Sequence, residues 1–131
     1  MWFNWFIFVV RPSVPRIVHP VPINSIITGT EGEVLTLACI SKGGFPAQTV
    51  DWYKTRVEQS SLKLLACTTH AVISQSLYDV TTTCTMIPTR EDDGAILLCQ
   101  SSHPGTPAMI EKSGNATLRL LCKLPTVNCK R

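Results

Sequence analysis

The chain has 131 residues, of which 44% are hydrophobic and 16% charged, and a formal net charge of +3. This length suits one domain with a single core, and the composition excludes a chain that is disordered throughout. The basic residues are scattered, apart from the pair Lys130 and Arg131, so charge gives no indication of nucleic-acid binding, and no apolar run reaches the roughly 18 residues of a membrane helix.

The first residues are apolar and the next are rich in proline. Residues 1–10 resemble the hydrophobic part of a secretory signal, but no basic residue precedes them and no small-residue cleavage site follows. They are either a weak signal or part of an upstream fragment of a larger gene product. Four prolines between Arg11 and Pro22 exclude a helix or a central strand, because proline lacks the backbone donor. We therefore predict that residues 1–17 form an apolar segment and an extended lead-in.

The pattern then changes to strict alternation, which indicates strands. In residues 34–39 the side chains of 35, 37 and 39 share a face, so Cys39 points inward. Residues 42–46 carry glycine and proline and predict a turn. Alternation returns in residues 49–54, where Val50 and Trp52 share the inward face.

The second half of the chain repeats this pattern of short strands and polar turns. Residues 62–67 are a weaker strand candidate, and the Thr-rich residues 78–86 a stronger one, with its even-numbered side chains inward. A polar corner at 89–94 precedes a strand at 95–100, and residues 115–121 form the last strand. No stretch has a competing helical period. The chain therefore predicts an all-β, two-sheet antiparallel sandwich of about seven strands.

The number and spacing of the cysteines indicate the redox compartment of the protein. Six cysteines occur at long, irregular spacings, without the paired CxxC clips of structural zinc sites. Disulfides and therefore an extracellular or cell-surface location are the better interpretation.

Three inward-facing residues, Cys39, Trp52 and Cys99, each lie on their own predicted strand. Their spacing resembles the immunoglobulin domain, in which a disulfide joins the two sheets and the indole packs against it. The resemblance implies a Cys39–Cys99 bond, worth roughly 4 kcal/mol in the chain-entropy model. Leu97 stands where most immunoglobulin domains have the corner tyrosine, so that hydrogen bond is absent here.

The C-terminal half of the chain narrows the resemblance to a subgroup of immunoglobulin domains. The run 89–100, with R-E-D-D-G before Cys99, and the following His103-Pro104 are similar to the constant-like second domain of nectin, nectin-like and nephrin-type adhesion molecules. The segments 31–33, 43–46 and 52–54 fit the same group, so that the resemblance covers residues 18–121 and leaves 122–131 as a C-terminal tail.

The remaining cysteines leave alternatives open. Cys67 and Cys84 lie on consecutive predicted strands and could be joined, or Cys84 is a small core residue and Cys67 a separate thiol. Cys122 and Cys129 follow the last strand. They could close a small terminal loop, bond to a neighbouring domain, or reflect a truncated or misjoined gene prediction.

Several residues could suggest metal binding or catalysis, but each has a simpler explanation. Cys67 and His70 have the spacing of half a zinc site, but no second ligand pair follows, so no metal or cofactor is expected. No hydrolase or phosphate-binding motif occurs. Asp92 and Asp93 could be paired catalytic carboxylates; we expect instead that Asp93 caps the corner and pairs with a basic residue. The chain is therefore predicted not to be an enzyme and to have no small-molecule substrate.

Two surface features bear on function. Asn115 begins the one N-x-S/T sequon and is a candidate glycosylation site. If the neighbouring residues point inward, Asp51, Tyr53, Ile96 and Leu98 point outward on one sheet and make a candidate partner-binding patch. The C-terminal strand or a glycan at Asn115 could instead cover this patch.

The resemblance implies a recognition or spacer module of a cell-surface adhesion receptor, whose partners are other immunoglobulin-superfamily proteins or domains of the same chain. It also implies that a membrane anchor belongs to the parent protein. Two alternatives are a fragment of an immune-type receptor and a self-contained, disulfide-rich secreted effector or inhibitor.

Overall fold

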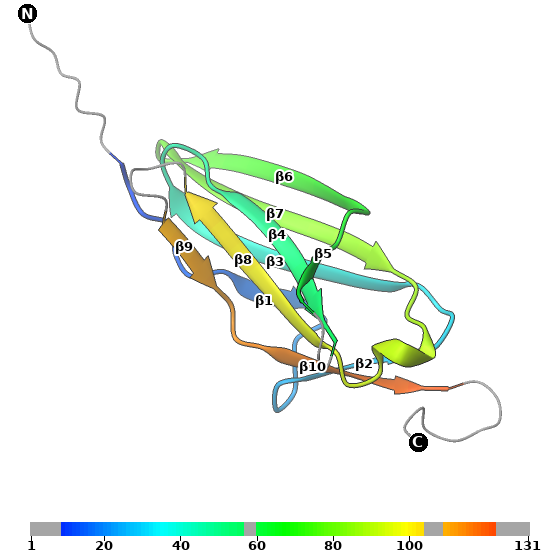
Figure 1. Cartoon of the computed structure of the whole chain (residues 1–131). Helices are drawn as coiled ribbons and strands as arrows, with labels where there is room; N and C mark the ends of the chain where they lie inside the picture. Colours follow the sequence, from blue (N-terminus) through cyan, green and yellow to red (C-terminus); the bar gives the residue numbers. More distant parts are fainter. Residues whose placement is uncertain (1–8, 57–59, 104–108, 123–131) are drawn as a thin grey trace, which may run out of the picture.

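The computed structural model describes residues 9–56, 60–103 and 109–122, which form two packed β-sheets (Figure 1). One sheet has the strand order β1 (Arg16–His19), β3 (Leu35–Gly44), β7 (Leu77–Met86) and β6 (Cys67–Ser74). The other has the order β2 (Ile26–Thr30), β10 (Ala116–Leu121), β8 (Ile96–His103), β4 (Thr49–Thr55) and β5 (Leu62–Lys63), and β9 (Met109–Lys112) also pairs with β8. All pairs are antiparallel except β2 with β10. The predicted two-sheet sandwich is confirmed.

The core forms where the alternating side chains of the two sheets meet. Leu37 and Cys39 of β3 face Trp52 of β4 and Leu97 and Cys99 of β8, and all five are completely buried. The inward faces predicted for these strands are therefore confirmed. The inward set of β7 is confirmed as well, because Val80, Thr82 and Cys84 are buried and Tyr78 and Met86 pack against the core.

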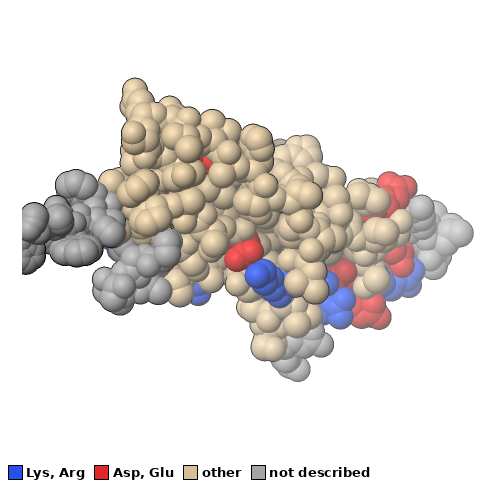
Figure 2. Space-filling view, turned by 90° about the horizontal axis from the view of Figure 1, so that it is seen from above, with Lys and Arg blue, Asp and Glu red and all other residues tan. Residues whose placement is uncertain are grey.

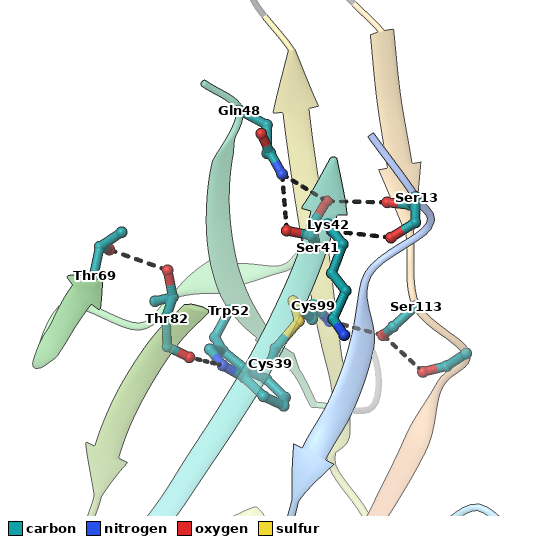
Figure 3. The surroundings of a disulfide bond; sticks show 11 residues. Ser13, Cys39, Ser41, Lys42, Gln48, Trp52, Thr69, Thr82, Cys99 and Ser113 are labelled. Carbon is teal, nitrogen blue, oxygen red and sulfur yellow. Dashed lines mark hydrogen bonds between the residues drawn. A yellow bond between two sulfur atoms is a disulfide. The ribbon is translucent and has the colours of Figure 1, made fainter. Parts of the chain in front are cut away.

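A disulfide joins Cys39 and Cys99 through the middle of this core, with the two Cα atoms 6.5 Å apart (Figure 3). The ring of Trp52 lies beside it, and the indole Nε1 donates a hydrogen bond to the carbonyl oxygen of Thr82 at 3.2 Å. This bond satisfies the one polar atom of a fully buried side chain, which would otherwise lose its interaction with water. The bond that the resemblance implied between Cys39 and Cys99 is confirmed.

The proline-rich segment does more than lead into the sandwich. Residues 16–19 form edge strand β1, which pairs with β3 and places Ile17 in the core. The chain then crosses to the other sheet, where residues 26–30 form β2 beside β10. Our interpretation of this stretch as a lead-in was wrong in this respect, because proline is compatible with an edge strand whose outer donors are unused. Residues 1–8 of the apolar segment lie outside the described residues.

The strand predicted at 62–67 is wrong in its extent. Only Leu62 and Lys63 pair with β4, as β5. Residues 64–66 carry the chain across to the other sheet, where β6 begins at Cys67 and pairs with β7. The apolar run 62–67 therefore spans a crossing between two edges, which alternation alone does not distinguish from one strand.

The turn predicted at 42–46 begins later than expected. Strand β3 continues to Gly44 through an irregularity in its register with β7. Gly43 has a positive φ of 83°, and its N–H donates to the Asp79 carboxylate at 2.9 Å. A glycine at this position accommodates the left-handed backbone that the bulge requires.

A second irregularity separates β9 from β10. Both strands pair with β8, but the ladder is interrupted between Lys112 and Ala116. The Ser113 hydroxyl accepts a hydrogen bond from the N–H of Cys99 at 3.0 Å and so replaces a ladder bond (Figure 3). This bulge leaves Asn115 exposed to solvent.

Candidate functional site

The candidate partner-binding patch lies on the outer face of the sheet formed by β4 and β8. Tyr53 stands directly opposite Leu98 in the strand register, and Asp51 stands opposite Gln100. Ile96 lies one step further along β8, opposite Thr55. These side chains alternate with buried ones on both strands, so they point away from the core. The structure thus brings the four predicted residues onto one face, where each is half-buried.

Charged side chains border this patch. Lys63 of β5 stands opposite Tyr53, and its Nζ lies 3.5 Å from Asp51 Oδ1. This ion pair is exposed and contributes little to stability. On the other side, β9 adds Lys112 opposite Gln100. An apolar and aromatic centre with a charged border is the composition typical of protein-binding surfaces.

The sequence interpretation missed one apolar member of the same face. Ile110 of β9 lies opposite Ser102 of β8 and is 54% exposed. Strand β9 has only four residues and follows a stretch of sequence with two prolines and a glycine, so no alternation was long enough to reveal it. Only the strand register shows that Ile110 lies on the same outer face as the outward-pointing residues of β8.

Three further cysteines are also bonded. Cys67 and Cys84 stand opposite each other on β6 and β7 and form a second disulfide, so the alternative of separate thiols is wrong. Cys122 is buried and also disulfide-bonded. Cys129 lies outside the described residues.

The suggested half of a zinc site is not formed by Cys67 and His70. The sulfur of Cys67 is bonded to Cys84, and His70 points to the opposite face of β6 because the two positions differ by an odd number. Within the described ranges no group of three or more His, Cys, Asp or Glu side chains is arranged to hold a metal ion.

The corner before β8 is held by Asp92, not by Asp93 as predicted. Asp92 is 1% exposed, and its Oδ1 lies 3.0 Å from Lys54 Nζ and 2.7 Å from an Arg56 guanidinium nitrogen. Its other oxygen accepts a hydrogen bond from the backbone N–H of Thr89 at 2.9 Å. Burial alone would raise the pKa of Asp92, but the Thr89 hydrogen bond and the two cations outweigh it and hold this pKa below its usual value.

The carboxylate of the neighbouring residue, Asp93, contacts a different strand. Oδ1 of Asp93 accepts a hydrogen bond from the backbone N–H of Leu120 at 2.8 Å, which ties the corner to β10. Sequence could not separate the two aspartates, because each is polar and the short 3₁₀ turn Arg90–Asp92 decides which one turns inward. Both carboxylates are thus engaged in structural contacts.

No helix in the described ranges has the length and hydropathy needed to cross a bilayer.

Comparison with known families identifies the fold. The family of CD80-like C2-set immunoglobulin domains matches residues 18–108, and the chain belongs to this family. The predicted immunoglobulin-like sandwich is therefore confirmed. Domains of this family are typically non-catalytic, and immunoglobulin domains with disulfides are typically extracellular. A search of curated proteins found no match.

Solved structures share the fold at low sequence identity. The chain is similar to Rst D1–D2, with 17% identity and a TM-score of 0.69, over 86% of this chain and 50% of the other. It is similar to the full ectodomain (Ig1–Ig3) of mouse nectin-like molecule 4, with 19% identity and a TM-score of 0.58, over 86% and 35%. For bovine butyrophilin the identity is 14% and the TM-score 0.56, over 83% and 44%. The chain thus spans half or less of each of these structures, and its resemblance to a nectin-like domain is confirmed at the level of the fold.

Proposed function

We propose that this chain is a non-catalytic, extracellular recognition or spacer module of a cell-surface adhesion receptor. Membership of the CD80-like C2-set family supports this role, as do the disulfides, since such bonds form and persist mainly in oxidising compartments. The partners are other immunoglobulin-superfamily proteins, in homophilic or heterophilic pairs, or neighbouring domains of the same protein. In this proposal a membrane anchor belongs to the parent protein.

One observation carries the proposal: the outer face of β4 and β8 presents an aromatic and apolar centre. Tyr53, Leu98 and Ile96 occupy adjacent register positions, and Ile110 extends the apolar surface onto β9. Flat sheet faces of this kind bind through a few buried anchors surrounded by a polar border. Tyr53 and Leu98 are the expected anchors, because they lie at the centre of the face.

A substitution at the centre of this face tests the proposal. Leu98→Lys introduces a charge into the apolar centre, and we expect it to weaken binding at least about tenfold, since burying an unpaired charge is costly. The probe is a panel of purified immunoglobulin-superfamily ectodomains, including this chain itself, measured by surface plasmon resonance. Ile87→Lys is the matched control, because Ile87 is 61% exposed and lies outside the described strands.

The control variant should bind as the unmodified chain does. Equal binding by Leu98→Lys and the unmodified chain would remove this face from consideration. Failure of the unmodified chain to bind any ectodomain in the panel would contradict the recognition role.

Asn115 is the proposed glycosylation site. It is exposed in the bulge between β9 and β10 and borders a shallow hollow of about 280 Å³ together with Arg16 and Pro22. A glycan attached here would begin beside the N-terminal segment and close to Leu98, because Ala116 stands opposite Leu97 in the register. In protein secreted from eukaryotic cells, glycosidase treatment should increase electrophoretic mobility, and Asn115→Gln should abolish that difference.

The family description favours a second candidate, an immune-type receptor fragment, because the matching family is named CD80-like. The same face would then bind a receptor on another immune cell. The panel of ectodomains distinguishes the two roles by including adhesion molecules and immune receptors as separate groups.

A further inference from the structure

Strand β6 forms a free edge of the four-stranded sheet. Among the described strands, its eight residues, Cys67–Ser74, pair only with β7, and the strand runs along the upper border of the sandwich (Figure 1). All of them except Cys67 are exposed. A strand at such an edge presents unpaired backbone donors and acceptors to its surroundings.

The hydrogen-bond register determines which backbone groups face outward. The N–H of Thr85 donates to the carbonyl of Ala66 at 2.9 Å, so these two residues form a hydrogen-bonded pair. Bonded and non-bonded pairs alternate along an antiparallel ladder. The backbone groups of Thr69, Ala71 and Ile73 therefore point away from β7 and toward the open edge.

The sequence of β6 lacks the features that protect most edges. It is CTTHAVIS, with no Lys, Arg, Asp, Glu, Pro or Gly. Natural edge strands are usually blocked by charges, proline or bulges. Val72 and Ile73 are instead 48% and 61% exposed, and both favour strand structure. Figure 2 views the molecule from the β6 side, where most of the visible surface is uncharged and the charged side chains gather mainly toward one end.

The opposite sheet does not cover the inner side of this edge. Ala71 and Ile73 lie on the same face of β6 as Cys67, which turns toward the core. The nearest edge of the facing sheet is β5, which has only two residues, so both side chains stay exposed. An additional strand along β6 would pair the backbone and shield these side chains at the same time.

We propose that β6 is a homodimerisation edge, at which two copies of this chain pair antiparallel about a twofold axis at Ala71. With Ala71 opposite its own copy, Thr69 of one molecule lies opposite Ile73 of the other. All outward-facing backbone groups of these three residues then find partners, giving about six hydrogen bonds. The two four-stranded sheets become one continuous sheet across the dimer.

A second copy is the occupant that this edge fits best, because the strand is complementary to itself in that register. A small side chain meets a small one at the axis, and no charged side chain of β6 meets its own copy. A charged partner would find no opposite charge on the strand. The predicted contact is isologous, which closes at two molecules and does not propagate.

The expected dimer is weak. One strand of eight residues buries less surface than the roughly 800 Å² per partner of a standard interface. Association should therefore appear only at high concentration, or where many copies are held close together. Sedimentation equilibrium between about 10 µM and 1 mM covers the affinities expected of a contact below standard size.

Opposite charges at the axis provide the test. Ala71→Lys and Ala71→Glu each place two like charges face to face, so each variant alone should remain monomeric while the unmodified chain dimerises. An equal mixture of the two variants should associate again, because the charges then attract. Val34→Lys is the matched control, because Val34 is 64% exposed and lies outside β6. This variant should dimerise as the unmodified chain does.

Renewed association of the mixture also demonstrates that both variants are folded, and far-ultraviolet circular dichroism of each variant checks this independently. A chain that stays monomeric up to the highest concentration would overturn the proposal. Dimerisation that Ala71→Lys leaves unchanged would overturn it too, as would two folded variants that fail to associate when mixed. Leu98→Lys should leave this dimer intact, so the result is independent of the proposed recognition face.

Discussion

Two of the disulfides of this domain place the same covalent bond in opposite settings. Cys39–Cys99 joins the two sheets through the buried core, across a sequence separation of 60. Cys67–Cys84 joins neighbouring strands of one sheet, across a separation of 17, at the edge that β6 forms. The first bond determines how the layers pack, whereas the second fastens an exposed strand to a sheet that is already formed.

This difference indicates that location matters more than loop length. In the chain-entropy model, loop closure contributes about 4 kcal/mol for the longer loop and about 3 kcal/mol for the shorter. The larger contrast comes from packing, because the core bond is surrounded by Trp52, Leu37 and Leu97, and its loss also leaves a cavity. Near β6 the backbone hydrogen bonds with β7 remain when the sulfurs are removed.

The largest effect should follow from removing the core bond. Cys39→Ala together with Cys99→Ala should lower the free energy of unfolding by about 4 kcal/mol or more, since chain entropy and a buried cavity add. Urea unfolding followed by tryptophan fluorescence measures this change through Trp52. A loss smaller than that of the edge-bond variant would contradict the comparison.

Next in size is the buried carboxylate that fastens the corner between the layers. Asp92→Asn should lower the free energy of unfolding by about 3 kcal/mol at neutral pH, because Lys54 and Arg56 lose their buried partner. The pKa of Asp92 is lower in the folded state than in the unfolded chain, so its contribution is present above about pH 4 and disappears as the pH falls through the folded value.

Unfolding curves at a series of pH values provide the measurement for Asp92. The difference in stability between the unmodified chain and Asp92→Asn should be constant near neutral pH and vanish in acid. Asp93→Asn is the matched control, because within the described part of the chain Asp93 forms no ion pair and accepts a hydrogen bond from the Leu120 N–H. A difference between the unmodified chain and Asp92→Asn that persists in acid would count against the ion pairs as its cause.

A smaller loss should follow from removing the edge bond. Cys67→Ala together with Cys84→Ala should cost about 2 kcal/mol, less than the chain-entropy value, because the local hairpin already holds the strands together in part of the denatured ensemble. Amide hydrogen exchange should show faster exchange in β6 than in β4 or β8. Equal acceleration in all three strands would show that the edge bond also supports the core.

The smallest expected effect concerns a hydrogen bond between the edge and the core. The hydroxyls of Thr69 and Thr82 lie 3.0 Å apart, and Thr82 is 1% exposed (Figure 3). Thr69→Val should cost about 1 kcal/mol, because it leaves the buried hydroxyl without that partner. Thr68→Val is the matched control on the opposite face of β6, and chemical denaturation should show no measurable loss for it.

Sequence reasoning succeeded where one side chain in two had to be buried. Cys39, Trp52 and Cys99 could be placed on inward faces because alternation along a strand is a local property of the chain. It also placed Tyr53 and Leu98 on a shared outer face, since the outward positions follow once the inward ones are known. Their role in binding stays a prediction.

Sequence reasoning failed for short segments whose pairing is decided by strands remote in the sequence. The run 62–67 alternates like a single strand, but the structure divides it between two sheets. Strand β9 has only four residues, so Ile110 was missed on the candidate face. Such short segments become strands because a neighbour offers free backbone groups, and that neighbour is remote in sequence.

The sequence by itself determined the sandwich, its inward faces and the resemblance that implied the central disulfide, because these depend on periodicity and spacing within the chain. Only the tertiary structure decided that β1 completes one sheet while β2 joins the other, that Asp92 is the buried carboxylate, and that β6 keeps an open edge. These outcomes depend on which remote strands meet, and the free energy of that pairing is not contained in any local pattern.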